Sequence, residues 1–286
     1  MYTGSGYVKA VGSKVTVAKP GDAVLLSFDF CGACATCKSG TPSLCYKFNR
    51  MNFEENQVFT FADSKAKEQN SEQTPEIGGR FFGQSSFANY SVVSQASVVN
   101  ANDLVKNKEE LQLFAPLGCG IQTGSGTVIN VAKATEKDVL CIQGLGGVGL
   151  SAIMAAKIAG CRTVIGIDRV ESRLKLAKEL GATHVVDTSN LPEGKTVVEV
   201  VQEIADGVGP TVTIDTTGVP VLIKNAVELT RQGGKIIQVG SAPPDFQLDI
   251  PVFAFMVAGK VRCFEFVHSE LRGLTSTIDL YGRHRG

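Results

Sequence analysis

Asp138-Val-Leu-Cys-Ile-Gln-Gly144-Leu-Gly146-Gly147-Val148-Gly149 is the stretch that decides the fold of this chain. Its apolar run has the length of a β-strand and ends in a Gly-x-Gly-x-x-Gly turn, after which apolar residues recur at helical spacing. In that context the first glycine permits a tight turn, the second lets the backbone approach a pyrophosphate, and the third lets helix and strand pack closely. The helix N-terminus adds free N–H groups for the phosphates. We therefore predict that Gly144, Gly146, Gly147, Val148 and Gly149 bind a dinucleotide.

The pattern of strand and helix continues after this turn. It predicts strands at 138–143, 163–168, 183–187, 211–215, 235–239 and 260–266, with helices at 147–159, 171–180, 196–206 and 220–231. Alternating strands and helices indicate parallel βαβ units with right-handed crossovers. The second half of the chain is therefore predicted to be an α/β fold with a doubly wound, six-stranded parallel sheet.

Asp168 ends the second predicted strand and is the candidate partner of the cofactor's ribose. A carboxylate there accepts hydrogen bonds from the ribose hydroxyls and repels a 2′-phosphate, which favours NAD over NADP. Arg169 is a weak counter-argument, because an arginine at this point can meet a phosphate. The alternative is a glycine turn with a capping aspartate and no cofactor.

The first half of the chain is predicted to be β structure with many turns. Alternation at 6–12, the run at 15–18, and the runs at 23–28 and 87–93 predict strands, and the polar segment 63–79 predicts an exposed loop. Between them lies Cys31-Gly-Ala-Cys34-Ala-Thr-Cys37, followed by Cys45. Four cysteines at this spacing suit a tetrahedral, structural zinc site with no open position. Unpaired or redox-active thiols and an iron–sulfur cluster remain alternatives.

Composition excludes several classes of function. The 286 residues are 43% hydrophobic and 20% charged, which is typical of a globular protein with a real core. The formal net charge is zero, so nothing indicates nucleic acid or an anionic membrane as a partner. We see no signal peptide and no apolar run long enough to span a bilayer, and we expect a cytoplasmic protein. Cysteines outside a secretory context are interpreted as thiols or ligands, and Cys141, Cys161 and Cys263 as buried core thiols.

Several motifs together resemble the zinc-containing medium-chain alcohol dehydrogenases. They are the cysteine lobe after Gly21-Asp22, the segment Phe82-Gly-Gln-Ser-Ser-Phe-Ala, the segment Pro116-Leu-Gly-Cys119-Gly-Ile-Gln-Thr123, and the glycine turn. The second of these is most similar to the aryl- or benzyl-alcohol branch. The resemblance extends to about residue 266 and implies an incomplete GroES-like β domain at 1–115 and a Rossmann NAD-binding domain at 116–286.

The resemblance also implies roles for three further residues. Cys119 corresponds to a ligand of a second, catalytic zinc, Thr123 to a residue beside the nicotinamide, and Arg173 to a basic residue that contacts the ribose. A catalytic zinc has three protein ligands and an open position, and it acts as a Lewis acid on the alcohol. The implied cofactors are therefore NAD and zinc.

The other ligands of that zinc are missing from the family's usual positions. Tyr2 and Thr3 stand where the family has histidine and glutamate, and the early cysteine would precede residue 1. The three histidines, His184, His268 and His284, lie in or after the dinucleotide domain, and His184 is interpreted as structural. We expect either a form of an active enzyme that is truncated at both ends or a degenerate relative, with exposed apolar surface on the β domain. Recruitment of Glu54 or Glu55 as a ligand is a further hypothesis.

Three functions compete. The leading hypothesis is an NAD-dependent oxidoreductase that interconverts a primary alcohol, aromatic in the benzyl branch, and its aldehyde. The second is a truncated, inert relative that binds NAD and structural zinc, and the third is a zinc-independent reductase of the same superfamily. Small-molecule alcohols and aldehydes are the expected partners. The apolar stretch 250–258 indicates homo-oligomer pairing or core packing equally, and 268–281 is predicted to form one short helix.

Overall fold

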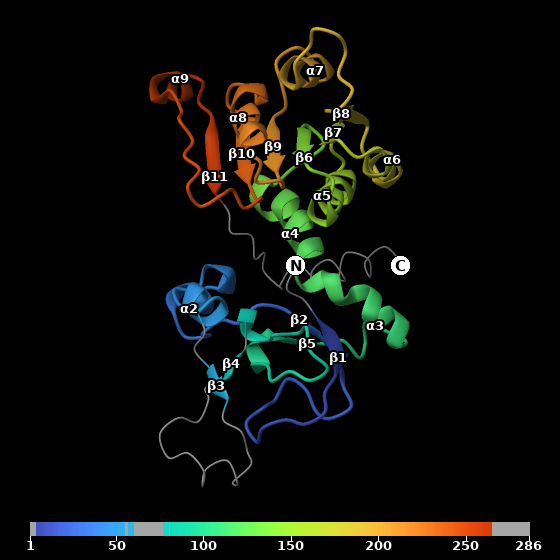
Figure 1. Cartoon of the computed structure of the whole chain (residues 1–286), viewed down its shortest axis with the longest axis vertical. Helices are drawn as coiled ribbons and strands as arrows, with labels where there is room; N and C mark the ends of the chain where they lie inside the picture. Colours follow the sequence, from blue (N-terminus) through green and yellow to red (C-terminus); the bar gives the residue numbers. More distant parts are fainter. Residues whose placement is uncertain (1–3, 55–56, 60–76, 80, 265–286) are drawn as a thin grey trace. The chain divides into compact units, whose positions relative to one another are not determined.

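The computed structural model describes residues 4–54, 57–59, 77–79 and 81–264 (Figure 1). The chain divides after Cys119 into two compact units, and each is described by itself. Within the described ranges, no helix combines the length and apolar character that a bilayer span requires. The predicted helix at 268–281 lies outside these ranges.

The second unit is built on a parallel sheet of six strands, in the order β11-β10-β9-β6-β7-β8 (Figure 1). The strands are β6 (Val139–Gln143), β7 (Thr163–Asp168), β8 (His184–Asp187), β9 (Val212–Asp215), β10 (Lys235–Gln238) and β11 (Val261–Phe264). Numbered along the chain, this order is 3-2-1-4-5-6, the order of a doubly wound dinucleotide-binding sheet. The predicted fold class is confirmed, and each predicted strand matches an observed one.

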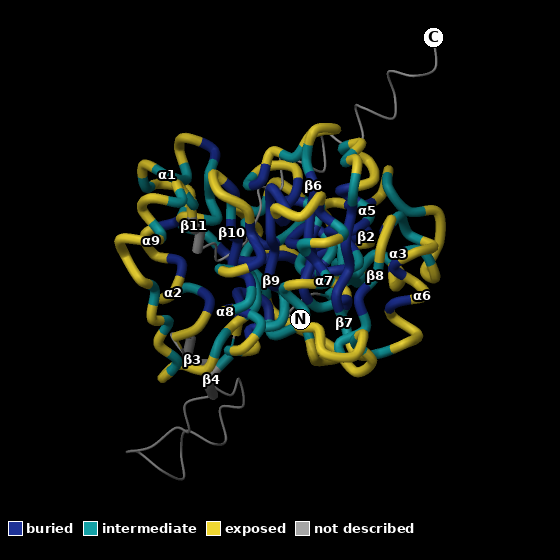
Figure 2. Tube along the Cα trace, turned by 90° about the horizontal axis from the view of Figure 1, so that it is seen from above, coloured by how far each residue is buried: buried dark blue, intermediate teal, exposed yellow. Residues whose placement is uncertain are grey.

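Helices cover both faces of this sheet, and the central strand shows why. Leu140 and Ile142 of β6 belong to one buried cluster with residues of α5 and α6. Val139 and Cys141 belong to a second cluster with residues of α7 and α8. Alternate side chains of a strand point to opposite faces, so the apolar run from Val139 to Ile142 requires cover on both sides. In Figure 2 the central strands β6 and β9 are drawn in the dark blue of buried residues. The helices of this unit are α4 (Gly120–Gly126), the π-helical turn η6 (Thr127–Ala132), α5 (Gly147–Ile158), α6 (Glu171–Leu180), α7 (Val197–Ile204), α8 (Pro220–Leu229) and α9 (Val252–Val257).

Helix α7 begins where expected and ends earlier than the predicted 206. Thr196 and Glu199 form a capping box, in which each side chain accepts a hydrogen bond from the other residue's backbone N–H. The helix stops at Ile204 because Asp206 and Gly207 both have positive φ angles, which a right-handed helix cannot contain.

The first unit contains a three-stranded antiparallel sheet in the order β1-β2-β5 and a separate hairpin β3-β4. The strands are β1 (Ser5–Tyr7), β2 (Ala23–Leu26), β3 (Gln57–Phe59), β4 (Ile77–Gly79) and β5 (Val98–Asn100). The helices are α1 (Ala35–Lys38), η1 (Pro42–Leu44), α2 (Phe48–Asn52), η3 (Phe81–Gly83), η4 (Gln95–Ser97), α3 (Lys108–Phe114) and η5 (Ala115–Gly118). Ala23 and Leu25 of β2 pack with Ala101 and with Leu111 of α3, so this sheet has its own small core.

Several predicted strands of this unit are wrong in position. Residues 87–93 and 15–18 form no strand, and the first strand is shorter than the predicted 6–12. The partner of β2 is instead Val98–Asn100, and apolar alternation alone cannot tell which segment will find a hydrogen-bonding neighbour. The predicted loop 63–79 is corrected at its end, where Ile77–Gly79 pairs with β3, and 60–76 lies outside the described residues.

Exposed apolar side chains are frequent in the first unit, as expected. Phe87, Tyr90 and Val92 are among the most exposed large apolar residues. Tyr90 and Val92 also line a groove of about 480 Å³ beside β1. The segment that was predicted to be a strand therefore lies at the surface and contributes nothing to the core of the sheet.

Two predictions about core cysteines can be checked. Cys141 is completely buried in β6, as predicted. Cys161 is only partly buried, because it follows the end of α5 and packs against the rim of the core. The side chain of Cys263 lies outside what the structure describes.

Candidate dinucleotide and metal sites

The three glycines of the turn between β6 and α5 are required for three different reasons. Gly144 has a φ of +87°, a conformation that side chains rarely adopt. A Cβ atom on Gly149 would overlap the carbonyl oxygen of Gly144, so the start of α5 can lie against the turn only without a side chain. A Cβ on Gly146 would meet nothing within 4 Å. The protein itself gives no reason for glycine at 146, and close approach of a bound phosphate does give one.

Thr216 holds this turn from the neighbouring strand, and sequence reasoning missed it. Its hydroxyl lies 2.9 Å from the carbonyl oxygens of both Gln143 and Gly144 and donates to them. The backbone N–H of Thr216 also donates to the carbonyl of Gln143. The signal in the sequence is Asp215-Thr-Thr-Gly218 directly after a strand, but only the pairing of β6 with β9 brings it to the glycine turn.

Gly124 is a second residue that the sequence did not reveal as important. A Cβ at this position of α4 would overlap the carbonyl oxygen of Val148 in α5. The two helices therefore approach with backbone against backbone. Thr123, the preceding residue of α4, is buried, and its role beside a nicotinamide stays a prediction.

Asp168 occupies the carboxyl end of β7 and ties the glycine turn to it. Its carboxylate accepts hydrogen bonds from the N–H groups of Leu145 at 2.7 Å, Arg169 at 2.7 Å and Val170 at 3.0 Å. Arg173 lies 3.7 Å from the same carboxylate. Burial alone raises the pKa of Asp168, but the three amides and the arginine outweigh it and lower this pKa below its ordinary value. The carboxylate is therefore ionised, as recognition of ribose hydroxyls requires.

We expect Gly146→Ala to weaken NAD binding without weakening the fold. Gly146 has φ −75° and ψ −170°, which alanine adopts freely, and its Cβ has open space. The added methyl occupies the space of the phosphate, so the Kd for NAD should rise roughly 10-fold or more, while the thermal midpoint stays within about 2 °C. Isothermal titration and a thermal melt measure both.

Gly12→Ala is the matched control, because a Cβ there also meets nothing within 4 Å and the residue lies in the other unit. An unchanged NAD affinity in Gly146→Ala would contradict the assignment of this turn as the phosphate site.

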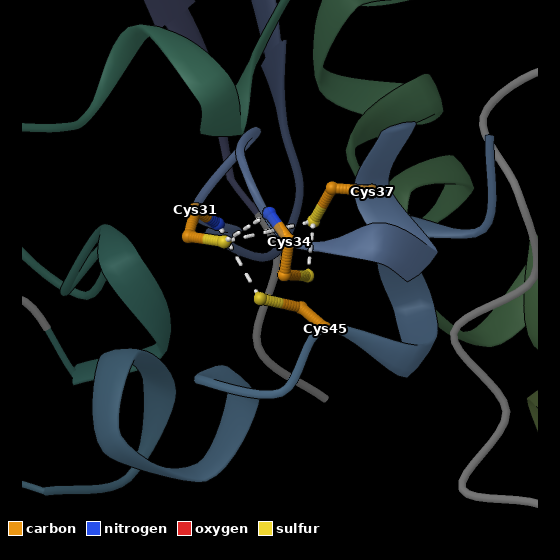
Figure 3. Close-up of side chains that lie close together, drawn as sticks. All are labelled: Cys31, Cys34, Cys37 and Cys45. Carbon is orange, nitrogen blue, oxygen red and sulfur yellow. Dashed lines mark hydrogen bonds between the residues drawn. The ribbon is translucent and has the colours of Figure 1, made fainter. Parts of the chain in front are cut away.

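The four predicted cysteine ligands come together in the first unit (Figure 3). The sulfur atoms of Cys31, Cys34, Cys37 and Cys45 all lie within 4.8 Å of one another. Short elements bring them there: Cys37 lies in α1, and Cys45 caps the end of η1. Backbone N–H groups point at the sulfurs, with Cys34 donating to Cys31 and both Cys31 and Lys47 donating to Cys45, each at 3.4 Å.

The surroundings of these thiols shift the pKa values of Cys34 and Cys37 in opposite directions. Hydrogen bonds from the Thr36 hydroxyl and from the amides of Cys37 and Tyr46 lower the pKa of Cys34 to about 5. Burial and the neighbouring Cys34 raise the pKa of Cys37 to about 12. Several thiolates this close repel one another unless a cation lies between them. A divalent ion removes that conflict, so the four sulfurs fit zinc, although four thiolates also suit an iron–sulfur cluster.

Aromatic rings pack against this cysteine lobe. Phe28, Phe48 and Phe82 form one buried cluster with Cys45, and the other three cysteines lie at its edge. Phe82 has a φ of +57°, which is rare for a bulky residue. Its ring lies 5.7 Å from the ring of Phe53 and 6.3 Å from that of Phe48, so the cysteine lobe packs against a connected group of aromatic rings.

Among the residues that the structure describes, no group of metal ligands forms around Cys119. Cys119 follows η5 and is partly buried. In the described ranges, the four-cysteine cluster is the one group of three or more His, Cys, Asp or Glu residues that could hold a metal. Glu54 is exposed and belongs to no such group, and Glu55 lies outside the described residues. His184 is exposed on β8, with its Nδ1 2.9 Å from the Thr183 hydroxyl, and its structural role stays a prediction. His268 and His284 lie outside the described residues.

The second unit has a doubly wound sheet with the glycine turn, and the first unit is a β unit with four clustered thiols. This combination defines the class of zinc-binding dehydrogenases. Comparison of the sequence with family models agrees in both units. Residues 2–103 match the alcohol dehydrogenase GroES-like domain, and residues 147–271 match the zinc-binding dehydrogenase domain.

Individual relatives narrow the class to one family. Over 250 residues the chain is 39% identical to geraniol dehydrogenase of Castellaniella defragrans. This alignment covers 85% of the chain and 62% of geraniol dehydrogenase. A probable alcohol dehydrogenase of Pseudomonas sp. is 36% identical over 242 residues, covering 85% of this chain and 72% of the relative. The crystal structure of benzyl alcohol dehydrogenase from Acinetobacter calcoaceticus superposes with a TM-score of 0.81 at 34% identity, covering 98% of this chain and 72% of that one. The chain belongs to the zinc-containing alcohol dehydrogenase family. It spans less than two thirds of the length of geraniol dehydrogenase.

Proposed function

We propose that this chain is an NAD-dependent oxidoreductase that interconverts a primary alcohol, aromatic by preference, and its aldehyde by hydride transfer. The observation that carries the proposal is the glycine turn with an ionised Asp168 at the end of the adjacent strand. The family supports the reaction type, and the similarity to benzyl alcohol dehydrogenase supports an aromatic alcohol. The β domain is proposed to comprise 1–115 and the dinucleotide domain 116–286.

The residues of the second unit would bind and orient the cofactor. Gly146, Gly147 and Val148 would present the turn and the first amides of α5 to the pyrophosphate. Asp168 would accept hydrogen bonds from the ribose, with Arg173 beside it, and Thr123 would lie at the nicotinamide. When bound, NAD supplies the carbon that accepts the hydride.

The four-cysteine lobe would hold a structural zinc. All four positions are filled by sulfur, so no position is left for water or substrate. The ion would fix the first unit rather than take part in the reaction. Cys119 is proposed as one ligand of a second zinc, but no three-ligand group surrounds it within the described residues, so no step is derived through that ion.

Measurement of NADH formation tests this proposal. We expect turnover of benzyl alcohol in the presence of NAD and zinc, with less turnover of a short aliphatic alcohol. An inert relative is the second candidate, because the described residues hold one metal group and not two. Two zinc ions per chain by metal analysis support the enzyme. One zinc, tight NAD binding and no turnover of either alcohol would instead establish the inert form.

Asp168→Asn is expected to relax the preference for NAD over NADP. The neutral amide no longer repels a 2′-phosphate and accepts weaker hydrogen bonds, so the Kd for NAD should rise roughly 10-fold while NADP binding improves. Asp187→Asn is the matched control, because Asp187 pairs in register with Asp168 at the end of the next strand. Equal effects of the two substitutions on the ratio of NADP to NAD affinity would contradict the assignment.

Pairing with a second copy of the chain is proposed for α9. Core packing was the alternative for this stretch, but α9 buries none of its residues, and Val252, Phe253, Met256 and Val257 are all exposed. An apolar helix face of this kind is typical of an interface between subunits. Light scattering in solution tests for the dimer.

A cytoplasmic location is also proposed. The described cysteines are free thiols, and four of them form the proposed zinc cluster, which is typical of a reducing compartment.

A further inference from the structure

Thr36 connects the first and last segments of the cysteine lobe through one hydroxyl group. Its Oγ1 lies 3.1 Å from the sulfur of Cys34 and 2.9 Å from the carbonyl oxygen of Leu44. Leu44 directly precedes Cys45, the fourth ligand. Among the described residues, the other hydrogen-bond partners of the four sulfurs are backbone amides or fellow cysteines. The hydroxyl of Thr36 is therefore a distinct side-chain contact to the cluster.

The backbone of Thr36 is held as well as its side chain. Its carbonyl oxygen accepts hydrogen bonds from the N–H of Thr41 at 2.8 Å and from the Ser39 hydroxyl at 2.9 Å. The hydroxyl is thus held close to both of its partners, and rotation about one bond is enough to redirect its hydrogen.

The Thr36 hydroxyl has one hydrogen and lies within hydrogen-bond distance of two groups that can accept it, the Cys34 sulfur at 3.1 Å and the Leu44 carbonyl at 2.9 Å. A metal-bound Cys34 is a thiolate and carries no hydrogen. The hydroxyl then donates either to the thiolate or to the carbonyl. Donation to an ionised acceptor is roughly twice as strong as donation to a neutral one.

We propose that Thr36 is a positioning residue for the metal of the cysteine lobe: its hydroxyl, held beside the Cys34 sulfur and the Leu44 carbonyl, donates to the Cys34 sulfur when the ion is bound. This hydrogen bond orients the Cys34 sulfur and offsets part of its negative charge. Supporting residues of this kind change metal affinity by roughly 10- to 100-fold. The inference rests on the proposed structural zinc and adds a residue that controls how tightly this ion is held.

Cobalt substitution in the full chain tests the proposal. Thr36→Val keeps the shape of the side chain and removes the hydroxyl, and Thr36→Ser keeps the hydroxyl. Thr41→Val is the matched control, because Thr41 lies in the same lobe and its hydroxyl contacts Ser39 and none of the sulfurs. Competition with a chromophoric chelator measures zinc affinity, and the thiolate-to-cobalt charge-transfer band reports the electron density on sulfur.

We expect zinc affinity to fall roughly 10- to 100-fold in Thr36→Val and the charge-transfer band to move to longer wavelength, because the sulfur loses a donor. Thr36→Ser and Thr41→Val should stay near wild type in both readouts. Wild-type affinity and an unmoved band in Thr36→Val would overturn the inference alone. If Thr36→Val does not fold, Thr36→Ser and Thr36→Ala are compared, and equal affinity in these two overturns it as well. A wild-type chain that binds no cobalt in the lobe refutes the proposed zinc site itself.

Discussion

Gly149→Ala is expected to destabilise the second unit more than any other single methyl group added to the glycine turn. The new Cβ would overlap the carbonyl oxygen of Gly144, and that carbonyl also accepts the hydrogen bond from Thr216. Relief of the overlap requires backbone movement in a turn that β6, α5 and β9 hold from three sides. Steric strain of this kind costs on the order of 4 kcal/mol, which lowers the thermal midpoint by roughly 10 °C in a unit of this size.

Differential scanning calorimetry and NAD titration measure the effect. NAD binding should be lost in Gly149→Ala together with stability, whereas Gly146→Ala should weaken NAD binding and leave the stability unchanged. Comparison of the two variants distinguishes Gly149, which the fold requires, from Gly146, which is proposed to face the ligand. A Gly149→Ala variant with the melting temperature of the wild type would show that the turn and helix are farther apart than the structure places them.

Cys37→Ser should remove the metal from the cysteine lobe and loosen the first unit. A serine hydroxyl is a poor zinc ligand and leaves a tetrahedral site with three sulfurs. The loss of affinity should exceed the roughly 100-fold that removal of a supporting residue costs. Because the lobe packs on Phe28, Phe48 and Phe82, loss of the ion should also lower the stability of this unit by several kcal/mol, as in other small structural zinc sites.

Metal analysis of the purified variant, followed by limited proteolysis at the lobe, checks this expectation. Cys161→Ser is the control, because Cys161 lies in the other unit and burial raises the pKa of its thiol to about 11. The control should keep its metal. Full zinc content and unchanged protease resistance in Cys37→Ser would contradict a four-thiolate site.

The agreement between expectation and structure differs between the two units. In the second unit, Leu140 to Gln143 and the apolar runs of β7, β9 and β10 are buried on both faces of the sheet, so composition and turn residues were enough to locate these strands. In the first unit, 87–93 has the composition of a strand but lies exposed, and the partner of β2 is Val98–Asn100. Strand pairing between distant segments depends on the whole sheet, which local patterns do not describe.

The candidate sites show the same division. The spacing of Cys31, Cys34, Cys37 and Cys45 was sufficient to predict that the four sulfurs meet, because close spacing in sequence limits how far ligands can separate. Thr36 lay inside that motif and was overlooked, because its importance comes from its contact with Leu44. Likewise, Thr216 and Gly124 act on the glycine turn and on α5 only after strands and helices have packed.

By itself, the sequence determined the doubly wound fold, the glycine turn and the four-cysteine cluster, since each depends on residues near one another in the chain and on backbone conformations that few residue types allow. Only the tertiary structure decided that Gly146 faces open space while Gly149 faces a carbonyl oxygen, that Asp168 fastens the turn as well as ending a strand, and that α9 lies exposed. The physical reason is that steric overlap, burial and hydrogen bonding between separate segments arise from their three-dimensional contacts, which spacing along the chain does not encode.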